Sequence, residues 1–257
     1  MKKFIVSLFG VAIAAAVIML MVSSKKKDTF IMPVNTNSEK GFVVMELFTS
    51  QGCSSCPAAD EILGTYAMKN DDHIIPLAFH VDYWNRLGWV DSFSNSKYTE
   101  RQQEYASKFN LGSIYTPQLV INGQKELVGS EQSGIASLVN KFLKDQSGII
   151  ITASTPAITS GRVLVPYSVN TVPSNSSLNA ALVQDNAITH IKAGENRGVK
   201  LTNYNIVRNF TKQRLSATTG NIALQLPSAN TTNGYSVVLF VQDETSGKIT
   251  GAAKIKL

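Results

Sequence analysis

The sequence predicts an α/β domain followed by an all-β, sandwich-like domain, with a hydrophobic helix at the N-terminus. Three observations support this: an uncharged stretch near the start, alternating strand-like and helix-like segments up to residue 147, and short β-branched runs separated by turns after it. At 257 residues the chain exceeds a typical domain of about 100–150 residues, so two domains are expected. The predicted segments are a signal anchor or signal peptide at 1–27, a linker at 28–40, an α/β domain at 41–147 and a β-sandwich-like domain at 148–257.

The hydrophobic segment runs from Phe4 to Val22, with lysines on both sides. Its length is close to the roughly 20 residues of a membrane-spanning helix and exceeds the roughly 7–15 apolar residues of a secretory signal. No Ala-x-Ala cleavage site closes it. We therefore expect a signal anchor that associates with the inner membrane through residues 4–22 and places the rest of the chain in the periplasm or another extracytoplasmic compartment. The alternative is a cleaved signal peptide and secretion.

The net charge of +6 comes from 24 Lys+Arg and 18 Asp+Glu. Five of the basic residues lie within residues 2–27, beside the hydrophobic segment, whereas all acidic residues lie at Asp28 or later. The remainder of the chain is therefore nearly neutral. Because recognition of phosphates needs a basic face, the composition predicts no nucleic-acid partner.

Strands and helices alternate within residues 41–147. Apolar β-branched runs give way to segments with apolar residues at helical spacing, and Asn122-Gly123 is a preferred dipeptide of two-residue hairpin turns. Strand–helix–strand crossovers imply parallel strands with helices on the faces of the sheet. The predicted elements are a strand at 41–48, a helix at 57–70, a strand at 74–84, a helix at 96–109, a hairpin within 117–130 and a helix at 130–145 with Ser130 as N-cap.

The pattern changes at Gly148. Short β-branched runs are separated there by turns rich in Ser, Asn, Thr and Gly, which is typical of an antiparallel sandwich. The segment Thr202–Phe210 fits a strand or a helical turn equally well. This half has no cysteine and one histidine, and its charged residues, Glu195 among them, lack catalytic spacing. We expect it to carry no chemistry and to serve as a docking or positioning surface.

Both cysteines lie in the stretch ELFTSQGCSSCPAADEIL, where a strand gives way to a helix. The free N–H groups and partial positive charge of a helix start stabilise a thiolate, lowering the pKa of the first cysteine from about 8.5 to about 3.5–7.5. Cys53 is therefore expected to be the solvent-accessible nucleophile, and Cys56, more buried in the first turn, the thiol that resolves a mixed disulfide. The hydroxyls of Ser54 and Ser55 are placed to donate to a thiolate. This spacing predicts disulfide exchange with a protein or a small thiol or disulfide.

Three other uses of the pair stay open from the residues alone. A structural disulfide of this span closes a very short loop and adds little stability. A structural zinc ion needs four ligands, and the chain offers two cysteines and three histidines. Copper(I) favours soft thiolates, so the pair could form a non-catalytic copper(I)-binding or protein-binding module. Thiol–disulfide exchange, which requires no cofactor and no metal, is the first hypothesis.

Three polar or aromatic side chains alternate at the end of the second predicted strand. His80, Asp82 and Trp84 occupy every second position and are expected on one face, at the strand end where open α/β sheets bind ligands. Trp84 is a candidate substrate contact, and His80 and Asp82 are candidate accessory residues. His80 would support a Cys53 thiolate as a cation or supply a third copper(I) ligand. The alternative is a strand end that turns into a loop, with Trp84 packed over it.

Several motifs resemble known families. The order of elements, the Cys-x-x-Cys at the start of the first helix and Thr116-Pro117 before QLVING resemble the thioredoxin fold. The segments ELFTSQGCSSCPAAD, LAFHVDYWNRLGW, YTERQQEYASKFN and YTPQLVING are similar to a family of exported bacterial thioredoxin-like proteins classed as a domain of unknown function. GENRGVKLTNYNIVR and GYSVVLFVQDETSGKITGAA resemble the β-rich C-terminal half of that family. The resemblance extends from Gly41 to the end of the chain.

The resemblance to thioredoxins implies roles for five residues. It makes Cys53 the attacking thiol and Cys56 the resolving thiol. It places Thr116 and Pro117 in substrate binding, with Pro117 a cis-proline facing the cysteine pair, and makes Glu46 a buried acid that relays protons for the second cysteine. The alternative for Glu46 is a solvent-facing position on its strand. The chain is thus expected to be an exported, membrane-anchored thiol–disulfide oxidoreductase.

Overall fold

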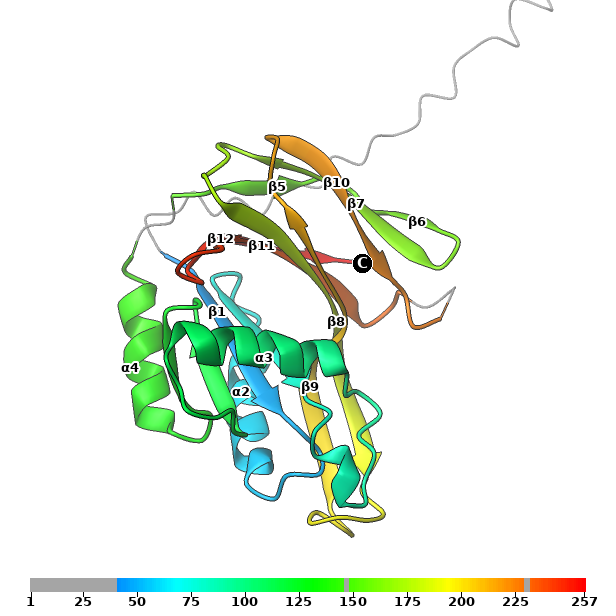
Figure 1. Ribbon diagram of the computed structural model, residues 1–257. Helices are drawn as coiled ribbons and strands as arrows, with labels where there is room; N and C mark the ends of the chain where they lie inside the picture. Colours follow the sequence, from blue (N-terminus) through cyan, green and yellow to red (C-terminus); the bar gives the residue numbers. More distant parts are fainter. Residues whose placement is uncertain (1–40, 146–147, 229–231) are drawn as a thin grey trace, which may run out of the picture. The chain divides into compact units, whose positions relative to one another are not determined.

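Seven elements of the first half of the chain have the order expected of a thioredoxin-like fold (Figure 1). The computed structural model describes residues 41–145, 148–228 and 232–257. The predicted signal anchor and linker, residues 1–40, lie outside the described residues. The elements are β1 (Val43–Thr49), α2 (Cys56–Lys69), β2 (Ile74–His80), α3 (Ser96–Lys108), β3 (Gln118–Ile121), β4 (Lys125–Val128) and α4 (Gln132–Phe142), with a short 3-10 helix η1 (Asn85–Leu87) after β2.

The strands of this half lie in the order β2-β1-β3-β4. β1 is parallel to β2, with α2 as the crossover, and antiparallel to β3. β3 and β4 form the predicted hairpin. Asn122 and Gly123 have φ values of 49° and 62°, and they are the two left-handed central residues of a turn closed by the hydrogen bond from Gln124 N–H to the carbonyl oxygen of Ile121. The sequence pattern therefore located this turn correctly.

The pleat of β1 divides its side chains between two helical layers. Met45 and Leu47 belong to the apolar cluster that includes α2 and α4, whereas Val44 and Phe48 belong to the cluster that includes Tyr105 of α3. Alternate strand residues point to opposite faces, so each further side chain of β1 is assigned to the α2 face or the α3 face. The candidate site is built on this division.

Several predicted boundaries differ from the structure, and two of them concern residues named above. β2 ends at His80 and not at Trp84, so His80, Asp82 and Trp84 do not continue one strand. The N-cap of α4 is Glu131 and not Ser130. Apolar spacing did not locate the end of β2 or the start of α4, because the sequence is already polar at both places.

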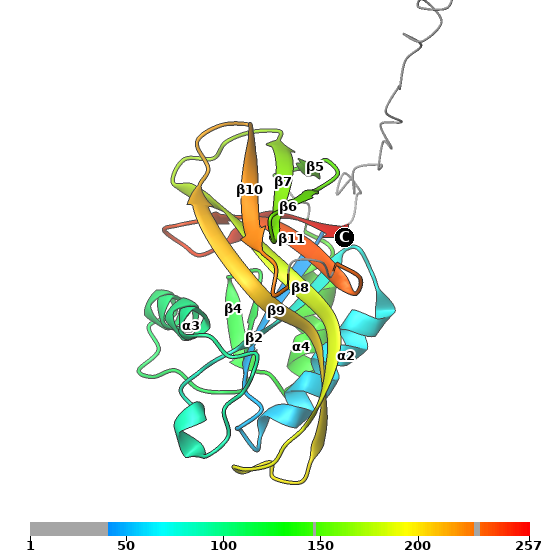
Figure 2. The same ribbon diagram turned by 90° about the vertical axis from the view of Figure 1, so that its right-hand side faces the viewer.

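The second half contributes eight strands, and four of them extend the first sheet (Figure 2). The larger sheet has the order β12-β11-β8-β9-β2-β1-β3-β4, and the smaller antiparallel sheet has the order β10-β7-β5, with β6 paired to β7. These strands are β5 (Ile151–Ala153), β6 (Ala157–Thr159), β7 (Arg162–Val169), β8 (Ser176–His190), β9 (Lys200–Arg214), β10 (Thr219–Gln225), β11 (Tyr235–Asp243) and β12 (Ile249–Lys256).

The smaller sheet packs on strands of the larger one, which gives the second half its sandwich-like character. Val163 and Val165 of β7 share an apolar cluster with Leu182 of β8 and Leu239 of β11. Neighbouring residues of β8 and β11 belong instead to the cluster beside α3, so these strands are buried on both faces. The fold is mixed α/β with a central mixed sheet and a smaller antiparallel sheet. The larger sheet continues across the predicted division at residue 147, and all described residues fall in one compact unit.

The junction between the two halves is the pairing of β2 with β9. The two strands are parallel and pair at Ala78 and Ile206. Pro76 of β2 lacks the N–H that a regular ladder would use, and the side chain amide of Asn205 donates to the carbonyl oxygen of Pro76 at 2.9 Å. Side chain hydrogen bonding therefore supplements a short backbone pairing.

Strands β8 and β9 are each 15 residues long, and their far ends lie beside the first half (Figure 1). Tyr204 of β9 packs on Gly64 of α2, where an added Cβ would lie 2.6 Å from the ring. Thr202–Phe210, which the pattern left undecided, is part of this strand. The loop between β8 and β9 thus lies at the same end of the sheet as the start of α2. Within the described residues, no helix is both long and apolar enough to cross a membrane.

Candidate active site

Cys53 and Cys56 form a disulfide at the start of α2, with their Cα atoms 5.4 Å apart. Cys56 is the first residue of α2 and Pro57 follows it, in the first turn where a missing N–H costs nothing. Both cysteines are 0% exposed. The expectation that Cys53 is open to solvent and Cys56 less so is therefore not met, because other residues cover the loop that carries them.

The loop before β3 lies against the disulfide. The Thr116–Pro117 peptide bond is cis, as the resemblance implied, and the carbonyl oxygen of Thr116 lies 4.0 Å from Cys53 Sγ. Trp84 fixes this loop by donating from Nε1 to Thr116 Oγ1 at 2.8 Å. The hydroxyl oxygen of Ser55 also lies close to the disulfide, 3.3 Å from Cys53 Sγ. Thr116, Trp84 and Ser55 are thus brought together around Cys53.

The loop between β8 and β9 also covers the cysteine pair. The side chain amide of Asn196 donates to the carbonyl oxygens of Gln51 and Cys53, both at 2.9 Å. The backbone N–H of Ser54 donates to Glu195 Oε2 at 3.0 Å. The second half therefore contributes side chains that position the cysteine loop. That it carries no chemistry of its own stays a prediction.

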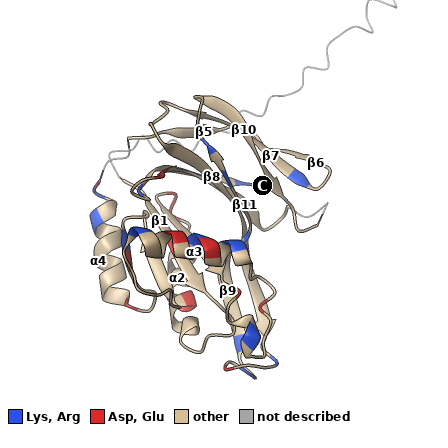
Figure 3. Ribbon diagram, viewed as in Figure 1, with Lys and Arg blue, Asp and Glu red and all other residues tan. Residues whose placement is uncertain are grey.

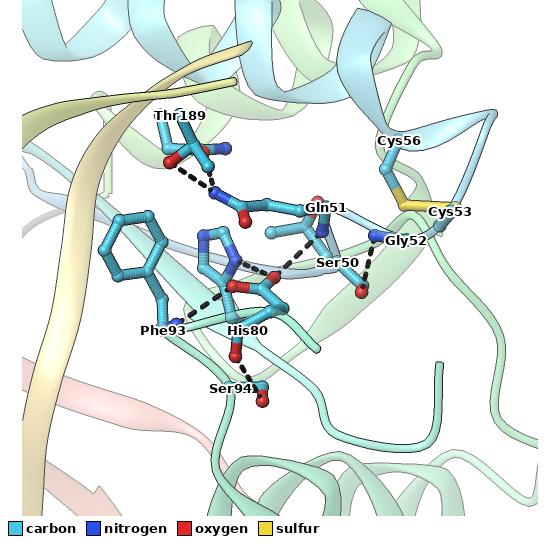
Figure 4. Close-up of polar contacts among 12 residues, drawn as sticks. Ser50, Gln51, Gly52, Cys53, Cys56, His80, Phe93, Ser94 and Thr189 are labelled. Carbon is cyan, nitrogen blue, oxygen red and sulfur yellow. Dashed lines mark hydrogen bonds and ion pairs between the residues drawn. A yellow bond between two sulfur atoms is a disulfide. The ribbon is translucent and has the colours of Figure 1, made fainter. Parts of the chain in front are cut away.

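A buried polar network supports the loop before Cys53 (Figure 4). The side chain amide of Gln51 donates to Thr189 Oγ1 at 3.0 Å and to Asn203 Oδ1 at 3.1 Å, on β8 and β9. Its side chain oxygen accepts a hydrogen bond from Trp89 Nε1 at 3.1 Å. The backbone N–H of Gln51 donates to Asp91 Oδ2 at 2.9 Å. Each polar group of this residue thus has a partner, which fixes the path of the chain into the cysteine pair.

His80 and Asp91 form a buried pair in this network. His80 Nδ1 lies 2.7 Å from Asp91 Oδ2, and both side chains are 0% exposed. Burial alone would lower the pKa of His80, but the charge and hydrogen bond of Asp91 outweigh it and raise that pKa above its ordinary value. Burial likewise opposes ionisation of Asp91, but His80 holds the pKa of Asp91 below its ordinary value. Each residue of the pair therefore favours the charged form of the other.

A second acid, Asp60, lies on α2 four residues after Cys56. It is buried, and it accepts a hydrogen bond from Thr49 Oγ1 at 3.2 Å. Thr49 and His80 are register partners at the ends of β1 and β2, so their side chains share the face that α2 covers. Burial raises the pKa of Asp60 to about 7, although the positive charge of His80 opposes the shift. Asp60 and Cys56 are four residues apart on one helix and hence neighbours on its surface.

Glu46 lies on the opposite face of β1, beneath α3. It is 0% exposed, so it is not the solvent-facing residue of the alternative interpretation. Its carboxylate binds the guanidinium of Arg101 through two hydrogen bonds, Nε to Oε2 at 2.5 Å and Nη2 to Oε1 at 3.0 Å. Tyr105 also donates to it. The buried acid on the side of Cys56 is Asp60, and the structure does not bring Glu46 to the cysteine pair.

Arg101 is enclosed by aromatic rings. Its guanidinium carbon lies 4.8–5.7 Å from four ring centroids, those of Phe79, Tyr105, Phe210 and Phe240. Gln242 of β11 accepts a hydrogen bond from Nη2 at 3.3 Å. Residues of both halves therefore surround the Glu46–Arg101 pair, which points to a structural use of this acid.

The structure separates the three residues predicted to share one strand face. His80 enters the network beneath α2, Asp82 accepts a hydrogen bond from Thr99 of α3 at 2.6 Å, and Trp84 reaches Thr116. Among residues 41–145, 148–228 and 232–257, no group of three or more His, Cys, Asp or Glu side chains is placed to hold a metal ion. His80 is thus not gathered with the cysteines as a third copper(I) ligand.

Sequence reasoning missed Asp60, Asp91 and Asn196. Asp60 had a local signal, since it follows Cys56 by four residues on a predicted helix with apolar neighbours. Asp91 lies in an irregular loop, and Asn196 lies 143 residues after Cys53 in the other half. No local pattern marks these two residues.

Comparison with known proteins supports the assignment of the fold. A structural genomics target of Agrobacterium tumefaciens, AtR35, is 26% identical with a TM-score of 0.63, over 83% of this chain and 93% of that one. HBP35 of Porphyromonas gingivalis is 15% identical with a TM-score of 0.62, over 86% of this chain and 76% of that one, and this likeness shows the fold alone.

No curated protein matches the chain. Residues 44–242 match a family described as "Protein of unknown function (DUF1223)". This match spans β1 to β11 and so includes the cysteine pair, the cis-proline loop and the β8–β9 loop. The chain therefore belongs to the DUF1223 family of proteins of unknown function.

Proposed function

We propose that the chain is a thiol–disulfide oxidoreductase that acts outside the cytoplasm on protein or small-molecule thiols and disulfides. The observation that carries this proposal is the disulfide between Cys53 and Cys56 at the start of α2, beside the cis peptide bond before Pro117, in a thioredoxin-like fold. The hydrophobic segment at residues 4–22 supports the proposed location, with the protein attached to the inner membrane.

In the proposed reaction, the Cys53 thiolate attacks one sulfur of a substrate disulfide. The second substrate sulfur leaves as a thiolate and takes up a proton. Cys56, deprotonated, then attacks Cys53 in the mixed disulfide and releases the other substrate sulfur as a thiolate, which is also protonated. The protein dithiol is oxidised to a disulfide while the substrate disulfide is reduced to two thiols, and the reverse sequence oxidises a substrate.

The surrounding residues have distinct parts in this scheme. Thr116, Pro117 and Trp84 line the substrate side of Cys53, and the Ser55 hydroxyl donates to the Cys53 thiolate. Asp60 takes the proton of Cys56 before it attacks, since it is the neighbouring buried acid on α2 and its pKa of about 7 allows exchange near neutral pH. His80 and Asp91 form a buried pair of opposite charges beneath α2, which adds no net charge to the site.

The test is catalysed reduction of insulin disulfides by full-length protein in mild detergent, with dithiothreitol as electron donor. We expect catalysis by the wild type and none by Cys53→Ser. Copper content after purification under reducing conditions separates the alternative, a copper(I)-binding module. Stoichiometric copper in a protein without exchange activity would overturn the proposal.

A further inference from the structure

Two residues at the tip of the β8–β9 hairpin, Glu195 and Asn196, contact the cysteine loop through their side chains. Both N–H groups of the Asn196 amide are used, one on the carbonyl oxygen of Gln51 and one on that of Cys53. Asn196 is 6% exposed, so these bonds are shielded from water. The amide bridges Gly52 and fixes the backbone on both sides of it.

The same tip presents a carboxylate to the cysteine pair. Glu195 Oε2 accepts a hydrogen bond at 3.0 Å from the backbone N–H of Ser54, the residue after Cys53. The hydrogen bonds from Ser54 lower the pKa of Glu195, so its carboxylate is ionised at neutral pH. Charges of both signs lie at this end of the fold (Figure 3). Asp91 binds the N–H of Gln51 from the buried side of the cysteine loop, and Glu195 binds the N–H of Ser54 from the exposed side.

Two acceptors thus occupy backbone N–H groups next to Cys53 in the disulfide form. Ser54 N–H donates to Glu195, and Cys56 N–H donates to the carbonyl oxygen of Cys53 at 3.3 Å. A Cys53 thiolate would be stabilised by N–H groups at this helix start. An ionised carboxylate on one of them competes with the thiolate and repels it.

We propose that Glu195 and Asn196 are positioning residues that favour the disulfide form of the Cys53–Cys56 pair. Glu195 disfavours the negative charge that reduction places on Cys53, and Asn196 holds the loop closed over the disulfide. The inference rests on the proposed function, since it assigns the residues that tune this exchange. Reduction by glutathione delivers two electrons and two protons: the Cys53–Cys56 bond breaks, two protein thiols form, and two glutathione molecules join in a disulfide.

The test of Glu195 is the equilibrium of the full-length protein with reduced and oxidised glutathione, read by alkylation and intact mass. Glu195→Gln keeps a hydrogen-bond acceptor but removes the charge, and we expect the equilibrium to move about two- to fivefold toward the dithiol. Glu195 is exposed, so the shift should shrink at 1 M salt, where screening is strong. A change caused only by altered packing would not depend on salt.

The matched control is Glu100→Gln, which removes an exposed carboxylate from α3 and should leave the equilibrium unchanged. If Glu195→Gln matches the wild type, or shifts the equilibrium equally at both salt concentrations, the proposal for Glu195 fails. If the wild type itself does not equilibrate with glutathione, the proposed function fails. The two failures are therefore distinguished by the wild-type measurement.

The test of Asn196 is the rate at which dithiothreitol reduces the disulfide. Asn196→Ala removes both hydrogen bonds that hold the loop, and we expect reduction at least about threefold faster, because less free energy opens the loop. Arg197→Ala changes an exposed neighbour on the same loop and should leave the rate unchanged. Equal rates for Asn196→Ala and the wild type would overturn the part assigned to Asn196.

Discussion

Asp60 lies one helical turn after Cys56 on α2, and both residues are buried. The hydroxyl of Thr49 donates to Asp60 at 3.2 Å, and His80 acts on Asp60 electrostatically from the end of β2. A carboxyl group with a pKa of about 7 therefore stands next to the second cysteine of the pair. We therefore expect the site to respond to pH in the physiological range.

The first prediction concerns stability. Burial raises the pKa of Asp60 from 3.8 to about 7 in the folded protein. The contribution of this group is then fully present below about pH 4 and is lost as pH rises through about 7. Asp60→Asn should abolish this loss of stability. Relative to the wild type, the variant should therefore be more stable at pH 8 than at pH 5, by on the order of a few kcal/mol of unfolding free energy. The measurement is urea unfolding of full-length protein in mild detergent at both pH values.

The control for Asp60→Asn is Glu100→Gln, which changes an exposed acid on α3. It should leave the difference between pH 5 and pH 8 unchanged. The proton-transfer role adds a kinetic expectation, since Asp60→Asn should slow the release of a mixed disulfide by Cys56 about 10²-fold or more near pH 7. An Asp60→Asn variant with wild-type pH dependence in both measurements would show that Asp60 is not the titrating group.

The second prediction concerns the His80–Asp91 pair. The pKa of His80 is raised in the folded protein, so its stabilising contribution is fully present below about pH 6.5 and is lost as pH rises through the raised value. His80→Gln leaves the Asp91 carboxylate buried without its partner and should cost about 3–5 kcal/mol at pH 6. The cost should be smaller at pH 9. Urea unfolding at the two pH values measures it.

His190→Gln provides the comparison for His80→Gln, because His190 is exposed on β8. It should change the unfolding free energy by less than about 0.5 kcal/mol at either pH. A His80→Gln variant that is destabilised more at pH 9 than at pH 6 would mean that His80 is neutral in the folded protein.

The third prediction concerns Glu46 and Arg101. The pair is buried and links β1 to α3, with Gln242 of β11 bound to the same guanidinium. Glu46→Gln and Arg101→Leu should each cost about 3–5 kcal/mol, because each leaves its partner charged and buried. The double variant should cost less than the two single changes combined, as a double-mutant cycle by urea unfolding will show. Glu46→Gln should leave the pKa of Cys53 unchanged.

A surface ion pair serves as the reference for this cycle. Lys212 Nζ lies 3.6 Å from Glu104 Oε2, at exposed positions, so Glu104→Gln should cost less than about 1 kcal/mol. If Glu46→Gln also cost less than about 1 kcal/mol of unfolding free energy and shifted the pKa of Cys53, the result would support the proton-relay role that the resemblance implied for Glu46.

Local patterns in the sequence predicted the elements of the first half well. The Asn122-Gly123 dipeptide located the β3–β4 turn because few residues adopt two successive left-handed conformations. The helix after Cys53 followed from apolar spacing and from Pro57 in its first turn. These signals act over a few residues, so they can be recognised without knowing the fold.

The parts that could not be predicted depend on distant pairing. Ala78 pairs with Ile206 because β9 joins the edge of the first sheet. Neither segment carries a sequence pattern that identifies the other as its partner. The face on which Glu46 lies depends on which helix covers which side of β1, and periodicity alone does not state this. Asn196 reaches Cys53 for the same reason, since the long β8–β9 hairpin brings the second half to the site.

The measurement that tests the central claim most directly is the trapping of a mixed disulfide through Cys53. Full-length Cys56→Ser and Cys53→Ser variants are each incubated with oxidised glutathione, and the adduct is followed by intact mass spectrometry. We predict that Cys53 in the Cys56→Ser variant forms the adduct about tenfold faster than Cys56 in the Cys53→Ser variant, and that the adduct persists because the resolving thiol is absent. Equal rates, or faster reaction through Cys56, would contradict the assignment of Cys53 as the attacking thiol.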